Sequence, residues 1–336
     1  MFRMLPNTDL NVHPLCLGGN VFGWGADRDQ SFAVLDAYVE AGGNFIDTAD
    51  TYSSWQGTDG GESETIIGDW MAARSNRDEL IIATKVGKLP GMNNLRPETI
   101  RTQMERSLRL LRTDRVDLYY AHMDHDDSMP DALGTFDSLV RSGHTRYLAA
   151  SNYSPERLSL ALDLATDNGW APFVALQPEY HLMNREFEKG LLQVCLERNL
   201  GVLPYYALAR GYLTGKYRVG GPDVESVRAA GASVYVGEQG EGVLSALEHV
   251  AADHEVPLAA AALAWLAARP TVVAPIASAR TVRQLAELLP MADLQLSAEE
   301  IAALDSASQP LMSYPSETLV LERPSNCEEA GRRGER

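Results

Sequence analysis

The sequence predicts a closed (β/α)8 TIM barrel, because short apolar runs alternate with longer amphipathic segments along most of its 336 residues. The runs are rich in β-branched and aliphatic residues and show little polar alternation, which is typical of parallel strands covered on both faces. Eight strand–helix repeats match a barrel. A doubly wound open sheet is the alternative, and it is disfavoured because no GxGxxG follows an early strand. The eight runs lie at 13–18, 44–47, 80–85, 116–122, 147–152, 173–178, 201–206 and 272–278.

The segments between the runs carry helix signals. Gly42 and Gly43 are placed to end the first helix. The segment 98–112 repeats apolar residues at helical spacing, which predicts one buried stripe. That stripe consists of Ile100, Met104, Leu108 and Leu111.

Two later helices are predicted by their first residues. Ser154 is a candidate N-cap, and Pro155 suits the first helical position. Ser297 and Glu300 have the spacing of a capping box.

Two segments stand outside the repeat. Residues 207–242 form a long Gly-rich insertion after the seventh run, and loops of this kind are usually functional. The polar segment 324–336 lacks periodicity, so we expect a mobile tail. Residues 1–323 are expected to form a single barrel domain.

Composition excludes several classes of partner. The formal net charge of −17 disfavours binding to nucleic acids and to anionic membranes. There is no apolar run long enough for a membrane span. Cys16, Cys195 and Cys327 have no paired spacing, which favours a cytoplasmic location and argues against a cysteine metal site. No histidine has metal-ligand spacing, so no metal is expected.

Polar residues follow the predicted strands at their carboxyl ends. In a barrel these positions surround one mouth, where such enzymes place their active sites. Asp47 can therefore meet Lys85 across the mouth. The full set is Asp47 with Tyr52, Lys85, His122, Ser151 with Asn152, Gln177, Tyr205 and Ser278.

Four of these residues have a joint chemical logic. A free tyrosine titrates near 10, too high for an efficient proton donor at neutral pH. A nearby Lys85 ammonium would lower the pKa of Tyr52, and Asp47 would keep that lysine charged. A neutral His122 can hydrogen-bond a substrate oxygen. The quartet suits a carbonyl group that is being reduced.

The chain also resembles the aldo-keto reductase family over almost its whole length. The similar segments are GGNFIDTADTYS, IIATKVG, TDRVDLYYAH, YLAASNYS, ALQPEYHLMNR, YYALARGYLTGKY and APIASARTVRQLAE. The resemblance implies a (β/α)8 barrel that uses NADPH (NADP+) to reduce aldehydes and ketones, with a long cofactor-covering loop after the seventh strand. It implies a small-molecule carbonyl substrate as the partner. The sequence neither identifies that substrate nor indicates an oligomeric state.

The resemblance also implies a role for each matching residue. Tyr52 would donate the proton, Lys85 and Asp47 would tune it, and His122 would position the carbonyl. The other matches would bind the cofactor: Ser151, Asn152 and Gln177 at the carboxamide, Tyr205 on the nicotinamide ring, Leu208, Gly211, Lys216, Arg218 and Ser278 in the clamping segments, Arg280 at the 2′-phosphate, and Gln284 and Glu287 at the adenine.

Three positions depart from the family pattern. Tyr206 and Ala207 stand where Ser-Pro is usual, so the serine contact to the pyrophosphate is replaced by a phenol. Ser278 stands where glycine is frequent. Leu288 replaces an asparagine that commonly contacts adenine, which removes one polar contact.

Two other functions remain open from the sequence. Potassium-channel β subunits share the barrel and the quartet, so a redox-sensing regulatory subunit with little turnover is the alternative. A Schiff base on Lys85, as in aldolases, is a third hypothesis, which the paired Asp47 argues against. Trp24 and Trp55 either line the substrate pocket or cover the barrel.

Overall fold

In the computed structural model, residues 1–125, 127–221, 226 and 228–309 are described, and the tail expected at 324–336 lies outside them. Their central feature is a sheet of eight parallel strands, and each strand overlaps a predicted apolar run, although β5 ends one residue after its run and β7 begins two residues before its run. The strands are β3 (Cys16–Gly18), β4 (Phe45–Asp47), β5 (Ile81–Val86), β6 (Val116–Ala121), β7 (Thr145–Ser151), β8 (Phe173–Gln177), β9 (Gly201–Val202) and β10 (Ile276–Ala277).

The sheet closes into a barrel, as predicted. β10 pairs in parallel with β3, so the last strand lies beside the first. On its other side the segment that leads into β10 meets β9, where Val273 N donates to Val202 O at 2.9 Å. Ile276 N donates to Pro204 O at 2.8 Å along the same seam.

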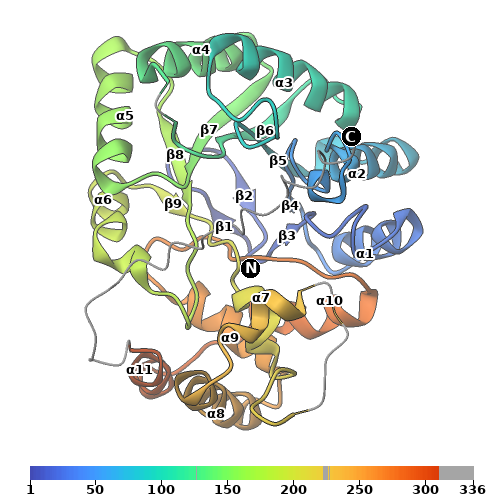
Figure 1. Ribbon diagram of the computed structural model, residues 1–336, viewed down its shortest axis with the longest axis vertical. Coiled ribbons are helices and arrows are strands. Elements are labelled where there is room, and N and C mark those ends of the chain that lie inside the picture. Colours follow the sequence, from blue (N-terminus) through green and yellow to red (C-terminus); the bar gives the residue numbers. More distant parts are fainter. Residues whose placement is uncertain (126, 222–225, 227, 310–336) are drawn as a thin grey trace, which may run out of the picture.

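Helices surround the strands (Figure 1). They are α1 (Arg28–Glu40), α2 (Glu62–Arg74), α3 (Pro97–Leu111), α4 (Met129–Arg141), α5 (Pro155–Asn168), α6 (Leu191–Glu197), α7 (Ala229–Ser233), α8 (Glu238–Asp253), α9 (Leu258–Ala267), α10 (Val282–Leu288) and α11 (Ala298–Ala307), with short 3-10 turns at Ser54–Gln56, Arg77–Glu79, Glu186–Lys189, Ala209–Thr214 and Leu289–Ala292. The stripe predicted for 98–112 is buried in α3. None of the described helices is long and apolar enough to cross a membrane.

The predicted helix ends are confirmed. The Ser154 hydroxyl accepts from the backbone at the start of α5, with Pro155 as the first helical residue. Ser297 and Glu300 form the capping box of α11. Gly42 follows α1 with φ of +86°, a conformation that glycine adopts without a steric cost.

Alternation along each strand separates two apolar layers. In β5, Ile82 and Val86 pack with the helices, whereas Ile81 and Ala83 belong to a second cluster inside the barrel. Successive strand residues point to opposite faces. Lys85 therefore shares the interior face with Ala83, but lies at the carboxyl end of the strand.

A hairpin that the sequence did not predict fills the opposite end of the barrel. β1 (Arg3–Met4) and β2 (Asn11–Val12) pair antiparallel. Leu5, Leu10 and Val12 are buried in the interior cluster. The hairpin thus closes the barrel at the amino ends of the strands.

The predicted insertion 207–242 extends past the end of the observed loop, because α8 begins at Glu238. Residues 238–242 form the first turns of α8 rather than a loop. The glycines there suggested a loop, but a Cβ on Gly240 would lie 2.1 Å from the Tyr235 carbonyl oxygen. Close packing, not chain flexibility, accounts for that glycine.

We propose that the hairpin and barrel form one domain, as expected for 1–323, although 310–323 lie outside the described residues.

Candidate active site

The strand ends bring the predicted quartet together at one mouth of the barrel. Asp47 ends β4, Lys85 is the penultimate residue of β5, and His122 directly follows β6. Tyr52 comes from the loop after β4. Because β4, β5 and β6 are neighbours in the sheet, these residues meet although they are far apart in sequence.

Lys85 directs its ammonium group at three acceptors. Its Nζ donates to Asp47 Oδ2 at 2.6 Å, to the Thr48 carbonyl at 2.7 Å and to Tyr52 Oη at 2.8 Å. An ammonium group has three hydrogens, so each has an acceptor. Lys85 is completely buried, and this complete pairing is what a buried charge requires.

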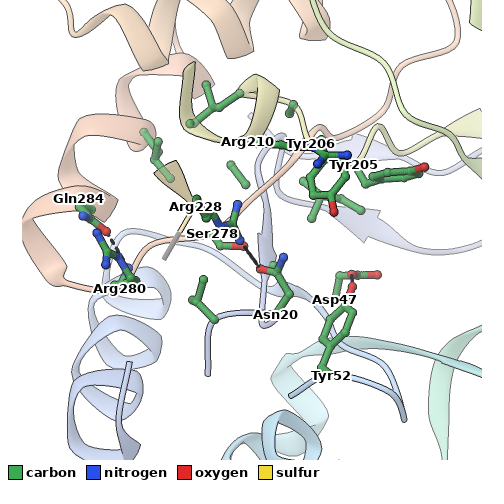
Figure 2. A pocket seen from close by; sticks show the side chains of 18 of the residues that line it. Asn20, Asp47, Tyr52, Tyr205, Tyr206, Arg210, Arg228, Ser278, Arg280 and Gln284 are labelled. Carbon is green, nitrogen blue, oxygen red and sulfur yellow. Dashed lines mark hydrogen bonds between the residues drawn. The ribbon is translucent and has the colours of Figure 1, made fainter. Parts of the chain in front are cut away.

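Asp47 is held just as fully. Its Oδ2 also accepts from Tyr52 Oη at 3.2 Å, and its Oδ1 accepts from Gln177 Nε2 at 2.9 Å. The carboxylate is therefore fixed from two sides. Figure 2 shows Tyr52 reaching up to Asp47 at one end of the pocket.

The pKa of Tyr52 differs from the sequence-based expectation. Burial, with the negative charge of Asp47 second, raises the pKa of Tyr52 well above its ordinary value. The expectation that Lys85 lowers it is therefore wrong for the free site. The phenol keeps its proton, while the Lys85 ammonium lies 2.8 Å away, placed to stabilise a phenolate once that proton leaves.

His122 is held as a neutral imidazole. Burial and then the charges of Lys85 and Lys88 lower the pKa of His122 well below its ordinary value. Its ring stands edge-on to Tyr52, with centroids 6.4 Å apart. Its buried Nδ1 has no hydrogen-bond partner among the described residues.

A second polar group lies beside the quartet. Asn152, in the left-handed region with φ of +58°, donates to the His122 carbonyl at 2.8 Å and to Ser151 Oγ at 2.9 Å. Tyr205 Oη donates to Asn152 Oδ1 at 3.0 Å. Ser151 Oγ donates to the Gln177 carbonyl at 2.8 Å. These contacts fix the side chains that the resemblance assigns to a carboxamide.

A cavity of about 700 Å³ joins these groups to the more distant predicted residues. It runs from Tyr52 to Arg280 and Gln284 (Figure 2), and His122 also lines it. Apart from Lys85 and Arg218, every predicted site residue lines it. These are Asp47, Tyr52, His122, Ser151, Asn152, Gln177, Tyr205, Leu208, Gly211, Lys216, Ser278, Arg280, Gln284 and Glu287.

Arg218 faces another part of the molecule. Its guanidinium pairs with Glu241 at 3.0 Å and with Glu248, both on α8. Its Nε also donates to the Gly215 carbonyl at 3.2 Å. The structure therefore ties Arg218 to α8 and separates it from the predicted cluster.

The far end of the cavity is polar and basic. The Arg280 backbone N–H donates to Gln284 Oε1 at 2.9 Å, and the Ser278 hydroxyl donates to Asn20 Oδ1 at 2.5 Å. Arg228 Nη2 donates to the same Asn20 oxygen at 3.0 Å. In Figure 2, Arg228, Ser278 and Asn20 lie between Tyr52 and Arg280. Leu288, predicted to be an apolar departure, lines this end as well.

Sequence reasoning missed several cavity residues. Asn20 lies two residues beyond β3 and Lys88 two beyond β5, so a slightly wider search at strand ends would have found both. Arg228 comes from the long loop, where the sequence shows a positively charged residue but does not indicate where in the fold it lies. Burial, then the charge of Arg280, lowers the pKa of Arg228, which places two guanidinium groups at one end of the cavity.

The phenol that departs from the family pattern reaches the cavity. Tyr206 lines it, stands edge-on to Tyr205 at 5.1 Å, and has the Arg210 guanidinium 4.8 Å from its ring centroid. Tyr206 and Arg210 both adopt positive φ values, +53° and +58°. Tyr206, in a strained conformation and stacked with Arg210, stands where a small hydroxyl is usual.

Of the two loop tryptophans, Trp55 lines the cavity and Trp24 supports it. Their rings meet edge-on with centroids 5.3 Å apart. Trp55 also lies 6.2 Å from the Tyr52 ring. An aromatic wall thus stands beside the proton-bearing phenol.

No group of three or more residues that could hold a metal ion is found among the described residues. Three histidines outside the quartet each hydrogen-bond to another residue. Their partners are the Gly87 carbonyl for His125, Ser142 for His144 and Glu179 for His181.

Comparison with known proteins shows the family. The model of the aldo/keto reductase family matches residues 14–309. Norsolorinic acid reductase B of Aspergillus parasiticus is 31% identical over 91% of this chain and 83% of its own length. Aldo-keto reductase ausK of Emericella nidulans is 33% identical, covering 91% of this chain and 81% of its own. Protein tas of Escherichia coli is 32% identical, covering 94% and 99%.

Proposed function

The chain belongs to the aldo/keto reductase family and is an NAD(P)H-dependent oxidoreductase, and from this premise we propose that it uses NADPH to reduce an aldehyde or ketone, with Tyr52 as proton donor. The observation that carries the proposal is the arrangement around Lys85. One ammonium group contacts both a fixed carboxylate and a phenol that opens onto the cavity.

Each member of the quartet takes one part of the reaction. Bound NADPH supplies a hydride for the carbonyl carbon. Tyr52 gives its proton to the carbonyl oxygen, and Lys85 stabilises the phenolate that remains. Asp47 keeps Lys85 charged and fixed. The neutral His122 hydrogen-bonds the substrate oxygen and orients it.

The residues of the cavity fit an elongated dinucleotide. Ser151, Asn152 and Gln177 offer amide and hydroxyl groups at the quartet end, and Tyr205 offers an aromatic face. Lys216 and the arginines toward the far end supply positive charge for phosphates. NADPH is favoured over NADH because Arg280 lies at that end, where a 2′-phosphate needs a cation.

The Schiff-base alternative is disfavoured by the same contacts. A lysine must lose a proton before it can attack a carbonyl. Lys85 instead gives all three ammonium hydrogens to acceptors within 2.8 Å. Loss of a proton would leave one of these acceptors without its donor.

Replacement of Tyr52 by Phe tests the proposal. We expect kcat to fall by at least about 100-fold, because the proton donor is lost. NADPH affinity should stay near wild type, since the ring remains. The measurement is NADPH oxidation at 340 nm across a panel of aldehydes and ketones, with fluorescence titration of the cofactor.

Tyr147→Phe is the matched control. The Tyr147 hydroxyl contacts Asp9 near the amino-terminal hairpin, away from the mouth. If Tyr52→Phe and Tyr147→Phe both retain wild-type turnover, Tyr52 is not the donor. If wild-type protein binds NADPH but reduces no carbonyl, the regulatory-subunit alternative is favoured instead.

We also propose a cytoplasmic location, since Cys16 and Cys195 are free and buried.

A further inference from the structure

Lys88 is a cation at the cavity wall that the proposed reaction does not use. It follows β5 and lines the cavity together with Tyr52, Trp55 and His122. It therefore belongs to the part of the cavity where a carbonyl substrate would meet the quartet.

The backbone around Lys88 is fixed on both sides. Thr51 Oγ1 donates to the Lys88 carbonyl at 3.3 Å. His125 Nε2 is 2.6 Å from the carbonyl of the preceding residue, Gly87. Gly87 has φ of +105°, which a residue with a side chain rarely adopts. The turn thus holds Lys88 at this position while its side chain stays exposed.

The ammonium group of Lys88 has no carboxylate partner within the described ranges. Lys85, by contrast, is neutralised by Asp47 at 2.6 Å, and Arg218 pairs with two glutamates. The charge of Lys88 reaches the reaction centre, because it contributes to the lowered pKa of His122. Although the Lys88 side chain is exposed, desolvation by the surrounding groups, followed by the charge of Lys85, lowers the pKa of Lys88.

We propose that Lys88 is a specificity-determining residue that binds an anionic group, such as a carboxylate, on the carbonyl substrate. This inference rests on the proposed function and adds a substrate class to it. The chain carries a net charge of −17, so an anionic substrate needs a local cation to approach the mouth. Lys88 supplies it next to Trp55, whose ring offers a face to an aromatic or apolar body.

Matched substrate pairs separate this charge effect from general activity. The pairs are 3-formylbenzoate and 4-formylbenzoate, each compared with its neutral methyl ester. The readout is the ratio of kcat/KM for the acid to that for the ester, which cancels changes in cofactor binding and in the chemical step. Wild-type protein should favour the acids, and added salt should reduce that preference.

Three variants complete the design. Lys88→Met should lower the acid-to-ester ratio by about tenfold, as expected for loss of a charge-assisted contact. Lys88→Arg keeps the charge and should hold the ratio within about threefold of wild type. Lys189→Met is the control, because Lys189 is an exposed lysine paired with Glu186 outside the cavity. It should leave the ratio unchanged.

An equal ratio in wild type and Lys88→Met, with both substrates reduced, would overturn the role of Lys88 while leaving the proposed function intact. If none of these four substrates is reduced, ligand binding decides the role of Lys88, while the wider carbonyl panel decides the proposed function. Calorimetric titration with benzoate and with benzamide, with and without NADP+, then compares wild type and Lys88→Met. Benzoate binding that is selectively weakened in the variant supports the inference; the same response to both ligands refutes it.

Discussion

Asp50 buries a carboxyl group in the loop that carries Tyr52, with neither oxygen hydrogen-bonded to any described residue. It lies two residues before Tyr52. Burial, followed by the charge of Glu64, raises the pKa of Asp50 well above its ordinary value. A raised pKa means that folding favours the protonated carboxyl group.

Asp50→Asn should therefore change how stability depends on pH. Below about pH 4 the carboxyl group is protonated in both states. Above that value the unfolded chain loses the proton and the folded chain keeps it, so unfolding free energy falls by up to about 1.4 kcal/mol per pH unit until the folded-state pKa is passed. The asparagine avoids this loss. In urea unfolding from pH 4 to 8, the unfolding free energy of the variant should rise relative to that of wild type as the pH increases. A difference between the two that does not change with pH would contradict this prediction.

Arg280→Ala should weaken NADPH binding by about 1.5–3 kcal/mol, the size of a charge-assisted hydrogen bond. NADH binding should hardly change, since NADH lacks the 2′-phosphate. Fluorescence titration of both cofactors measures the two affinities. Arg283→Ala is the comparator, because Arg283 lines the same cavity but is 91% exposed and pairs with Glu287, so its effect should be much smaller. Equal losses for the two cofactors would remove the 2′-phosphate role from Arg280.

The site residues that could be predicted are those tied to strand ends. Lys85 and His122 follow from their positions at the carboxyl ends of apolar runs, and the barrel brings those ends together. Arg228 could not be placed, because no periodicity fixes a long loop. Arg218 was misplaced for the same reason: only the fold shows that α8 presents Glu241 and Glu248 to it.

At the scale of elements, the hairpin of β1 and β2 was missed because two-residue strands carry no alternating pattern. Leu5 and Leu10 are isolated apolar residues in the sequence, yet both are buried in the barrel interior. The helices were easier to predict from the sequence, because capping residues such as Ser154 and Ser297 mark their starts. The sequence therefore predicts an element where a recognisable signal, such as a helix cap, lies within a few residues of its start.

Leu5→Ala tests whether the hairpin stabilises the barrel. Leu5 has no exposed surface and belongs to the interior cluster, so we expect a loss of about 2–5 kcal/mol of unfolding free energy. Leu160→Ala on α5 is the control, because Leu160 is 45% exposed and should change stability by about 0.5 kcal/mol or less. Urea unfolding measures both. If the two variants lose the same unfolding free energy, the hairpin does not seal the barrel interior.

At the scale of the whole molecule, the order of strands followed from their number and composition. Eight runs of the parallel type leave few arrangements, and a barrel satisfies all their backbone groups without a free edge. The start of α8 was misjudged, because the packing of Gly240 against Tyr235 depends on neighbours that the sequence does not reveal. Long-range contacts therefore decide what the local pattern leaves open.

The seam of the barrel has a consequence for the chain during its synthesis. Cys16 N donates to the Pro275 carbonyl, so β3, which pairs early with β4, finds its second partner β10 only after nearly all the described chain has been made. A ribosome adds roughly 5–20 residues per second, so β3 waits many seconds with one edge bare. Edges of this kind attract other chains. The nascent protein is thus most exposed to aggregation just before its last strand emerges, and a chaperone that covers β3 at that stage would protect it.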